Sequence, residues 1–467
     1  MSRGGGVPPG PYPGRRAVLR AAPLAAVAAV LSLTACREDD AGDASPASPA
    51  VPARAGGGPP APDVRGWTPL PAAPLQVPVL RAGQAAVWTG SQVLVWGGCT
   101  PFRDGCALAL TGDGAAWTPG ADGAGSWDVL APAPVAARAQ ARLWWTGSCA
   151  VLVGGLDPWA ACEARPAGFL DVASFTPSPT GPGTWTRRPD LPWPVGTTVD
   201  ASVWAGGAEG GATGQLFAWS ATAGAWSLGL GDSSWTRLPE PPWTPPAAPL
   251  SWSAVESWWT GSEWLVMGHV STGEALVVGL AFDPARSVWR TLDPGPLAGP
   301  AVRAVWTGER LLTFDVEAGV SSYDPVVDRW TAAPSGPLDE ICTWSPQGGP
   351  ALAWTGAELL VWGGARRGRD TGMCIDGNGR DDPEFAYGGR CNPATGPLGA
   401  AFDPAAGTWR TVPDGPWQRR GGATAVWTGE SVFLAGGVDL EATRTGQLPP
   451  FPDHPEQAFV LFTPARA

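Results

Sequence analysis

The feature that most constrains the fold of this chain is a unit of about 50 residues that recurs seven times. Its clearest copy, residues 407–437, reads GTWRTVPDGPWQRRGGATAVWTGESVFLAGG. Trp409 lies near its start, one apolar segment ends in Trp427-Thr428-Gly429, and the next ends in Gly436-Gly437. A repeat of this length is one supersecondary unit that stacks on its neighbours, so the repeat decides the architecture.

Three anchors count the units independently. The first is a Trp followed after six residues by Pro and an apolar residue, at Trp67, Trp127, Trp185, Trp235, Trp289, Trp330 and Trp409. The second is Trp-Thr-Gly, at Trp88, Trp145, Trp259, Trp306, Trp354 and Trp427, with Trp204-Ala205-Gly206 as its loosest copy. The third is an aromatic residue followed by Asp, Thr or Ser, at Trp117, Phe175, Trp219, Phe282, Tyr323, Phe402 and Phe462. Each anchor predicts seven units.

Each unit is predicted to form four short β-strands. Segments such as 85–89 and 93–96 are rich in β-branched, aromatic and apolar residues and are too short for helices. The Thr-Gly between them suits a type II′ hairpin turn with Gly at its first central position. The Gly-Gly pair that closes the second strand allows positive φ or close backbone approach. The fold class is therefore all-β, a seven-bladed β-propeller of four-stranded blades.

The two ends of the repeat region complement each other. Trp67 begins a fourth strand that has no third strand before it, and Phe462-Thr463-Pro464 is a third strand with almost nothing after it. We expect residues 67–71 to pair with residues 460–462 and close the ring, which removes the open sheet edge. The third unit is expected to carry an insertion between Ser220 and Trp235, and the fifth has Thr313-Phe314 in place of Gly-Gly.

The unit resembles the Kelch repeat, in which a strand ending in Gly-Gly is followed by an aromatic residue, Asp-Pro and a Trp. The resemblance covers all seven units, and Arg81, Arg138 and Arg420 match the Arg that often precedes the first Kelch strand. Kelch propellers include protein-binding scaffolds, galactose-oxidase-like enzymes and sugar epimerases, so the resemblance leaves function open. The copper site of galactose oxidase uses two Tyr and two His, whereas this chain beyond residue 36 has only Tyr323 and Tyr387. We therefore reject that activity.

The residues before the repeats predict export and a lipid anchor. Arg15, Arg16 and Arg20 precede the apolar residues 21–33, and Leu33-Thr34-Ala35-Cys36 resembles the bacterial lipobox. Residues 1–36 are thus read as a lipoprotein signal peptide whose Cys36 is lipidated, outside the cytoplasm at the cell surface or in the periplasm. The arginine pair also resembles a twin-arginine motif, so the export route stays open. Residues 37–64 are predicted to be a disordered Ala/Pro/Gly linker, and residues 65–467 the propeller.

Cysteine positions suggest disulfides, as export into an oxidising compartment allows. We expect three short pairs, each in the region between a blade's second and third strands: Cys99–Cys106, Cys149–Cys162 and Cys374–Cys391. Cys342 is either left over or competes for a partner in the sixth blade. A transition-metal site is not expected, because the chain has only two His residues.

Most of the Trp residues are interpreted as packing, because a residue type that recurs at one blade position fills the same space each time. Trp193, Trp243 and Trp417 stand where the other units have Leu or Val. We expect them to fill space between blades, where a larger ring can also line a cleft.

The longest loop between second and third strands is expected to carry the ligand site, on the face where the blade-to-blade loops also emerge. It covers residues 365–398, and a loop longer than about 12–15 residues is usually functional or disordered. The candidate binding residues are Arg366, Arg367, Asp370, Asp376, Asp381, Asp382, Tyr387 and Arg390, with Arg81, Arg138, Arg420 and His454 on the same face. Residues 376–382 loosely resemble a calcium loop, although Arg380 stands where an EF-hand needs an oxygen ligand. No other cofactor is expected.

Composition excludes several functions. The net charge of −12 argues against a nucleic-acid partner. We find no Ser-His-Asp motif, phosphate loop or HExxH, and the Asp-box of sialidases is missing. The favoured function is a monomeric binding module for a protein or carbohydrate, with the membrane as a further partner through the lipid anchor. The alternative is a carbohydrate-active enzyme, an epimerase or hydrolase, which would need two carboxylates and a Tyr or His together at the mouth of the ring.

Overall fold

The computed structural model describes residues 66–76, 81–100, 109–121, 123–157, 168–206, 214–242, 251–271, 275–293, 295, 303–315, 319–338, 341–342, 349–368, 390–392, 398–416, 420–439 and 458–464. The chain divides into two units, Met1–Pro59 and Pro60–Ala467, and every described residue belongs to the second. Across these ranges, no helix has the length and apolar character needed to cross a membrane.

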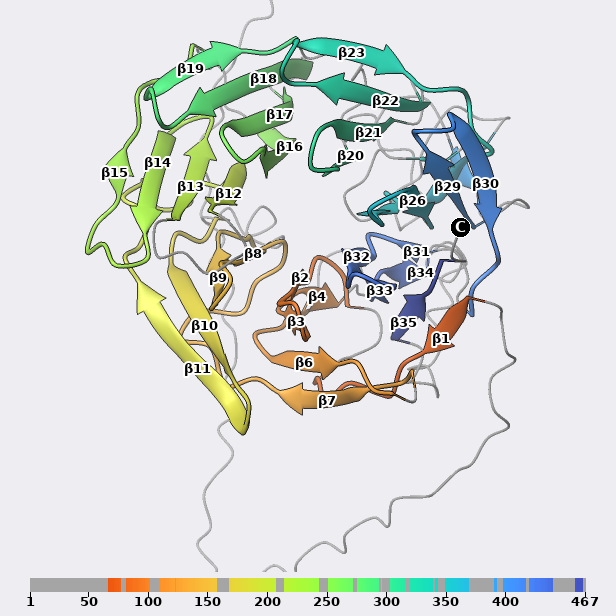
Figure 1. Ribbon diagram of the computed structural model, residues 1–467. Coiled ribbons are helices and arrows are strands. Elements are labelled where there is room, and N and C mark those ends of the chain that lie inside the picture. Colours follow the sequence, from red (N-terminus) through yellow and green to blue (C-terminus); the bar gives the residue numbers. More distant parts are fainter. Residues whose placement is uncertain are drawn as a thin grey trace, which may run out of the picture. The chain divides into compact units, whose positions relative to one another are not determined.

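Seven antiparallel sheets of four strands make up the second unit (Figure 1). We number them as blades and give their strands from the innermost outward. Blade 1 is β2 (Ala85–Trp88), β3 (Val93–Trp96), β6 (Gly114–Thr118) and β7 (Ser126–Val129). Blade 2 is β8 (Arg142–Trp145), β9 (Ala150–Val153), β10 (Val172–Ser178) and β11 (Gly181–Arg188). Blade 3 is β12 (Ala201–Ala205), β13 (Gln215–Ser220), β14 (Gly224–Gly229) and β15 (Thr236–Arg237).

The other four blades follow in chain order. Blade 4 is β16 (Ser251–Trp259), β17 (Trp264–Ser271), β18 (Ala275–Asp283) and β19 (Val288–Thr291). Blade 5 is β20 (Arg303–Trp306), β21 (Leu311–Asp315), β22 (Gly319–Asp324) and β23 (Arg329–Ala332). Blade 6 is β25 (Ala351–Trp354), β26 (Leu359–Trp362), β29 (Gly399–Asp403) and β30 (Thr408–Val412). Blade 7 is β32 (Thr424–Trp427), β33 (Val432–Ala435), β35 (Phe459–Phe462) and β1 (Trp67–Pro69).

The blades form a closed ring (Figure 1). Each innermost strand contacts the innermost strand of the next blade, in the cycle β2, β8, β12, β16, β20, β25, β32 and back to β2. One cluster of buried apolar side chains lies between each pair of neighbouring blades. The core is therefore divided into seven layers between sheets, and the prediction of an all-β, seven-bladed propeller is confirmed.

Blade 7 is assembled from the two ends of the propeller. Its outermost strand β1 pairs antiparallel with β35, with Trp67 opposite Phe462 and Pro69 opposite Val460. The ring of Trp67 packs on Phe462 at 4.9 Å and on Trp362 of blade 6 at 5.6 Å between centroids. The predicted closure by the N-terminal strand is confirmed.

A belt of hydrogen bonds runs along the outermost strands. In every blade, the Trp at or just before the fourth strand donates its Nε1–H to a backbone carbonyl that follows the fourth strand of the preceding blade, at 2.7 to 2.9 Å. The pairs are Trp67–Pro413, Trp127–Pro71, Trp185–Ala131, Trp235–Pro189, Trp289–Pro239, Trp330–Asp293 and Trp409–Pro334. We call these seven residues the indole belt. The packing role predicted for them is confirmed, and it includes the N–H group.

The Thr of Trp-Thr-Gly shapes the hairpin between the first two strands of a blade. In blade 1, Thr89 Oγ1 accepts a hydrogen bond from the N–H of Gln92 at 2.9 Å and donates to its carbonyl at 3.1 Å. Gly90 has a φ of 94°. Thr260 and Thr428 make the same contacts in blades 4 and 7. The predicted positive φ at the first central Gly is confirmed.

Blade 3 differs from its prediction. Trp219 was predicted in the third strand, but it lies in the second strand, β13, opposite Ala201. The third strand is β14, which is formed by residues predicted to be an insertion between Ser220 and Trp235. Trp219-Ser220 matches the residue types of the third-strand aromatic anchor, but it lies in the second strand of its blade. Trp204 pairs with Leu216 as Trp88 pairs with Val93, so the loosest copy of Trp-Thr-Gly keeps its place in the repeat.

Candidate functional site

On one face of the ring, the segments that connect blades meet the loops between second and third strands. Ala82 bridges Cys99 in blade 1, and Ala139 bridges Leu156 in blade 2. In blade 7, β31 (Arg420–Gly421) pairs with β34 (Val438–Asp439). We call this the connection face, and we call the opposite face, which carries the Thr-Gly hairpins, the hairpin face. The expectation that the two kinds of loop share one face is confirmed.

Arg81, Arg138 and Arg420 are buried at the connection face, where each binds the Gly-Gly pair of its own blade. Their guanidinium groups donate to the carbonyls of Gly97 at 3.1 Å, Gly154 at 3.1 Å and Gly436 at 3.3 Å, respectively. Two of them also pair with a carboxylate that immediately precedes a third strand: Arg81 with Asp113 at 2.9 Å and Arg138 with Asp171 at 2.6 Å.

The same arginines join neighbouring blades through their backbone carbonyls. The N–H of the second Gly in a pair donates to the Arg carbonyl of the next blade, in the pairs Gly98–Arg138, Gly364–Arg420 and Gly437–Arg81, at 2.8 to 3.0 Å. Gly is required because a Cβ on Gly436 would overlap the carbonyl oxygen of Arg81. We call the Gly-Gly pair of one blade, together with the Arg of the next blade that accepts its hydrogen bond, a clamp. Clamps join blade 6 to 7, blade 7 to 1 and blade 1 to 2.

These contacts show what the three arginines bind within the chain, and the binding role predicted for them stays a prediction. Arg81 and Arg138 have no exposed surface, and Arg420 is 8% exposed. Burial lowers the pKa of Arg81, and the charge of Asp113 opposes that shift. The guanidinium groups bind protein carbonyls and, in Arg81 and Arg138, carboxylates, so they hold the ring together.

The blade-6 loop forms a small sheet of its own on the connection face. Its strand β27 (Ala365–Gly368) pairs on one side with β24 (Ile341–Cys342) from the blade connection and on the other with β28 (Arg390–Asn392). The backbone therefore brings together Arg366, Arg367 and Arg390. Ile341 takes the pairing position that Arg420 has in blade 7. Asp370, Asp376, Asp381, Asp382, Tyr387 and His454 lie outside the described residues.

The structure shows no disulfide among the described residues. Cys99 and Cys149 are buried free thiols, and burial raises the pKa of Cys99 to about 11. Cys149 was expected between the second and third strands of its blade. That position is wrong, because Cys149 lies in the first hairpin, where it is bound to Thr146. The partners predicted for these thiols, Cys106 and Cys162, lie outside the described residues, so both pairings stay predictions.

The small sheet bears on whether Cys342 can form a disulfide with Cys391 of the sixth blade. Strand β27 separates Cys342 in β24 from Cys391 in β28. Two strand spacings amount to about 9.5 Å, beyond the roughly 7 Å that a disulfide allows between Cα atoms. Cys342 therefore does not compete for Cys391 in this arrangement. Cys374, the predicted partner of Cys391, lies outside the described residues.

Four charged residues at the innermost strands of blades 2 to 5 form a cluster that sequence reasoning missed. Arg142 of β8 donates from Nη2 to the carbonyl of Asp200, just before β12, at 3.1 Å and to the carbonyl of Val255 in β16 at 2.7 Å. One guanidinium thus reaches two further blades. Glu256 of β16 pairs with Arg303 of β20 at 3.3 Å. We call Arg142, Asp200, Glu256 and Arg303 the inner-strand cluster.

The cluster lies at the connection-face end of its strands. Arg142 begins β8 three residues after Ala139, which bridges Leu156 on that face. Arg303 likewise begins β20. The innermost strand of a blade has a free edge toward the centre of the ring, and Arg142 satisfies two carbonyls there.

Desolvation governs the electrostatics of the cluster. It lowers the pKa of Arg142, while the charges of Glu256 and Asp200 oppose the shift and Arg303 adds to it. Desolvation also raises the pKa of Asp200, against hydrogen bonds from the backbone N–H of Ala221 and the side chain of Thr198. Arg142, a partly buried cation, is thus coupled to two carboxylates, as ionisable groups often are at functional sites and also in structural ion-pair networks.

A signal for the cluster was present in the repeat. Three residues before the Trp of Trp-Thr-Gly, blades 1, 6 and 7 have Ala85, Ala351 and Thr424. Blades 2, 4 and 5 have Arg142, Glu256 and Arg303 at that position. Aligning the seven inner strands would have shown three charges at one otherwise small position. The contacts that Arg142, Glu256 and Arg303 make lie between different blades, and the spacing of the repeat does not predict contacts of that kind.

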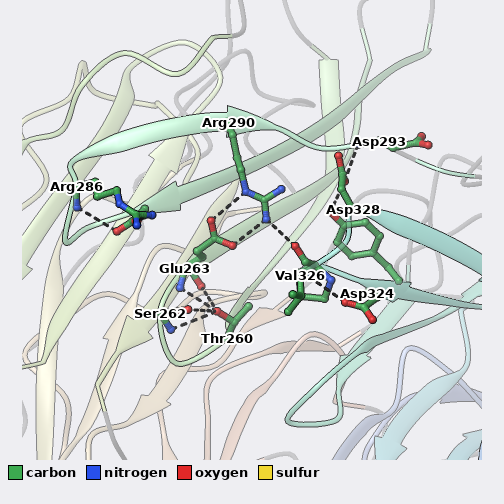
Figure 2. Close-up of polar contacts among 12 residues, drawn as sticks. Thr260, Ser262, Glu263, Arg286, Arg290, Asp293, Asp324, Val326 and Asp328 are labelled. Atoms are coloured by element: carbon green, nitrogen blue, oxygen red, sulfur yellow. Dashed lines mark hydrogen bonds and ion pairs between the residues drawn. The ribbon is translucent and has the colours of Figure 1, made fainter.

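A second polar network joins blades 4 and 5 near the hairpin face (Figure 2). Arg290 binds both carboxylate oxygens of Glu263, at 3.0 and 2.8 Å, and the carbonyl of Pro325 at 3.0 Å. The hydrogen bond with Glu263 raises the pKa of Arg290. Tyr323 donates to Asp328 at 2.6 Å, and burial followed by this contact raises the Tyr323 pKa. Each of these side chains already has its partner, so the network serves to join two blades.

Two other predictions concern metals and the larger aromatic residues. Within the described ranges, no group of three or more His, Cys, Asp or Glu residues could hold a metal ion. The calcium-like segment 376–382 lies outside those ranges. Trp193 is buried in the core between blades 2 and 3, as expected for a residue that fills space between blades. Trp243 and Trp417 are not among the described residues.

Comparison with protein-family models gives no match, and comparison with curated proteins gives none either. The architecture is therefore shown by the sheets themselves, while the likeness to Kelch repeats rests on the sequence pattern alone.

Proposed function

We propose that this protein is an exported, membrane-anchored, Kelch-like propeller that binds a protein or carbohydrate ligand at the connection face. The inner-strand cluster is the observation that carries the proposal. It places two arginines and two carboxylates around the centre of the ring, on the face that also holds the Arg366–Arg367–Arg390 sheet. Ligand sites collect where loops from several elements converge on a rigid scaffold.

The fold does not require these charges. Blades 1, 6 and 7 pack with Ala85, Ala351 and Thr424 at the same position of their inner strands. Partly removing these charged groups from water costs free energy, and the small residues of blades 1, 6 and 7 avoid that cost. A cluster kept at such a cost, and open to the centre of the ring, supports a binding role.

The chemistry of the cluster favours a polar ligand that both donates and accepts hydrogen bonds. Arg142 uses only Nη2 for the two carbonyls, and among the described residues no acceptor bonds to its Nε or Nη1. Asp200 and Glu256 supply acceptors beside it. Equal numbers of positive and negative groups make the cluster unsuited to a strongly charged ligand. Sugar hydroxyls and peptide groups both fit this requirement.

The alternative, a carbohydrate-active enzyme of the epimerase or hydrolase type, gains from one observation. Asp200 has a raised pKa and lies with Glu256 near one cation, as general acid–base pairs often do. Turnover of an oligosaccharide that Asp200→Asn abolishes, with binding retained, would favour the enzyme over the binding module.

The anchoring part of the proposal rests on the sequence of residues 1–36. Cys36→Ser should release the protein from the membrane fraction and change the processing of its N-terminus. Retention in the membrane with unchanged mature mass would contradict a lipid anchor at Cys36.

The ligand site is tested by matched variants of two glutamates in blade 4. The full chain is screened by thermal shift against oligosaccharides and peptides, because a ligand raises the melting temperature by mass action. Glu256→Gln changes the inner-strand cluster, and Glu263→Gln changes the hairpin-face network of Figure 2. Both variants remove one charge that is paired with an arginine.

We expect Glu256→Gln to weaken ligand binding at least tenfold and Glu263→Gln to leave it unchanged. Equal binding by the two variants would move the site away from the cluster. Replacing residues 369–389 with a short Gly-Ser turn then tests whether the blade-6 loop contributes, and it should leave the propeller folded.

A further inference from the structure

The inner strands end at the hairpin face in a circle of indole rings. These are the Trp residues of the Trp-Thr-Gly anchor and its loosest copy: Trp88, Trp145, Trp204, Trp259, Trp306, Trp354 and Trp427. Each packs into the core between its own blade and the preceding one. Because the innermost strands contact one another in a closed cycle, the seven rings encircle the centre of the ring. We call them the indole collar.

The N–H groups of the collar have no partner among the described residues. Trp204 is buried with its Nε1 unpaired. The other six are half-buried, and their Nε1 atoms are absent from both the hydrogen bonds and the buried unpaired atoms of the described structure, so they reach solvent. The indole belt is the opposite case, since all seven of its N–H groups are bound to a carbonyl.

The chain itself shows when a blade position needs Trp and not just an apolar ring. The aromatic position of the third strand is Phe175 and Phe402 in two blades, so no polar group is required there, although Trp117 and Tyr323 use theirs within the chain in two others. The belt position is Trp in all seven blades, and there the N–H is used each time. The collar position is also Trp in all seven, so by the same reasoning its N–H groups serve a purpose, and the acceptor comes from outside the chain.

The surroundings of the collar define what that acceptor can be. Next to the rings lie apolar side chains such as Val87, Val305 and Val426, so the surface offers apolar area and hydrogen-bond donors. The neighbouring hairpins carry Glu309 and Glu430, which disfavour an anion. A carbohydrate supplies hydroxyl and ring oxygens as acceptors together with C–H faces that pack on aromatic rings. Trp suits such surfaces because one part is apolar and the other polar.

We propose that the indole collar is a binding site for a neutral carbohydrate chain on the hairpin face. This site is separate from the inner-strand cluster, which lies at the opposite ends of the same strands. Six of the seven rings, all but the buried Trp204, present their N–H groups to solvent, so a repeating glycan could engage several of them at once, and affinity should rise steeply with chain length.

The test uses the full chain with maltohexaose, cellohexaose and chitohexaose, followed by Trp fluorescence and by the indole N–H signals in NMR. We expect at least one hexasaccharide to bind saturably and its monosaccharide to bind at least tenfold more weakly. Trp306→Phe with Trp427→Phe should weaken binding at least tenfold, because Phe keeps the packing and loses the N–H. Trp330→Phe, in the indole belt, is the matched control and should bind as the unmodified chain does.

Three results would overturn the proposal: no saturable binding of any hexasaccharide, equal loss in the belt control, or binding of inorganic phosphate in preference to sugar. If the double variant fails to fold, the unmodified chain still decides the matter. Its six collar N–H groups other than that of the buried Trp204 should exchange rapidly with water and become protected on adding the sugar, while belt N–H groups stay protected throughout. Glu256→Gln should leave this binding unchanged, so the outcome is distinguishable from that at the connection face.

Discussion

Two arcs of the ring hold their blades together at the connection face in different ways. In blades 6, 7, 1 and 2, clamps of Gly-Gly and a buried Arg join each blade to the next. From blade 2 to blade 5, the inner-strand cluster joins the blades through Arg142 and through the Glu256–Arg303 pair. We call these the clamped arc and the charged arc.

The difference shows that one repeat can serve two purposes. In the clamps Arg81 and Arg138 are fully buried and their carboxylate partners are 20% and 15% exposed, whereas in the charged arc the arginine itself, Arg303, is 30% exposed and its partner Glu256 is 22% exposed. The clamped arc thus has buried arginines, and the charged arc has an ion pair of which both partners are partly accessible. The indole belt runs through both arcs, so its hydrogen bonds join the blades in the same way in the closing blade and in the charged arc.

Removing the arginine of a clamp should have the largest effect. Arg81→Met leaves Asp113 Oδ1 and the carbonyl of Gly97 without the arginine, and removing this partly buried pair should cost about 3 kcal/mol. Arg303→Met, in the charged arc, breaks a partly exposed pair and should cost about 1 kcal/mol. Urea unfolding of both variants measures the difference. Similar midpoints for the two would remove the distinction between the arcs.

A methyl group inside a clamp should have the next largest effect. In Gly436→Ala, the new Cβ meets the Arg81 carbonyl at a residue with φ of 63°, and the combined strain should cost about 2–4 kcal/mol. Gly429→Ala is the control, because its φ of 95° is also positive but its Cβ meets open space. The control should lose about 1–2 kcal/mol. Equal losses in thermal unfolding would mean that the clamp tolerates the methyl group.

The indole belt should behave alike in both arcs. Trp409→Phe in blade 6 and Trp330→Phe in blade 5 each remove one hydrogen bond to the preceding blade. Each should lower the free energy of unfolding by about 1 kcal/mol. A clear difference between the two, in parallel urea titrations, would show that the belt does not contribute evenly around the ring.

The smallest effect concerns the pH dependence of the charged arc. Burial raises the folded-state pKa of Asp200 above its ordinary value of 3.8. The folded state therefore holds this proton more tightly than the unfolded state, and stability falls as pH rises from about 3.8 through the folded-state pKa. Asp200→Asn cannot lose a proton, so its melting temperature should gain on that of the unmodified chain across this window. A difference that stays constant from pH 3 to 7 would show that Asp200 has an ordinary pKa.

Most of the architecture could be predicted because it depends on spacing along the chain. Seven copies of Trp409 and its equivalents fixed the number of blades, and the unmatched strand at Trp67 fixed the closure. Gly90 in the hairpin turn could be predicted because only Gly takes that φ without strain. The third blade failed because Trp219-Ser220 has the composition of the anchor one strand early.

The candidate site was less predictable because it depends on contacts between blades. Arg81 looked available for a ligand, and its burial follows from Asp113 and from the next blade, neither of which the repeat spacing brings into view. Arg142 was overlooked because its two acceptors are backbone carbonyls. Every residue has such a carbonyl, so no residue type in the sequence marks these acceptors. Most of the residues chosen in the blade-6 loop lie outside the described part of the chain, and their binding role stays a prediction.

The pairing of β1 with β35 in blade 7 also determines when in synthesis the ring can close. Strand β1 leaves the ribosome before the other strands of the ring and its partner β35 after them, so β1 has no neighbour to pair with while the intervening blades are made. Until then the growing chain exposes an unpaired strand edge, the kind of surface that attracts other chains. A protein truncated near its carboxyl end would remain in that state permanently. The synthesis of β35 therefore decides whether a chain closes into a ring or stays exposed to aggregation and proteolysis.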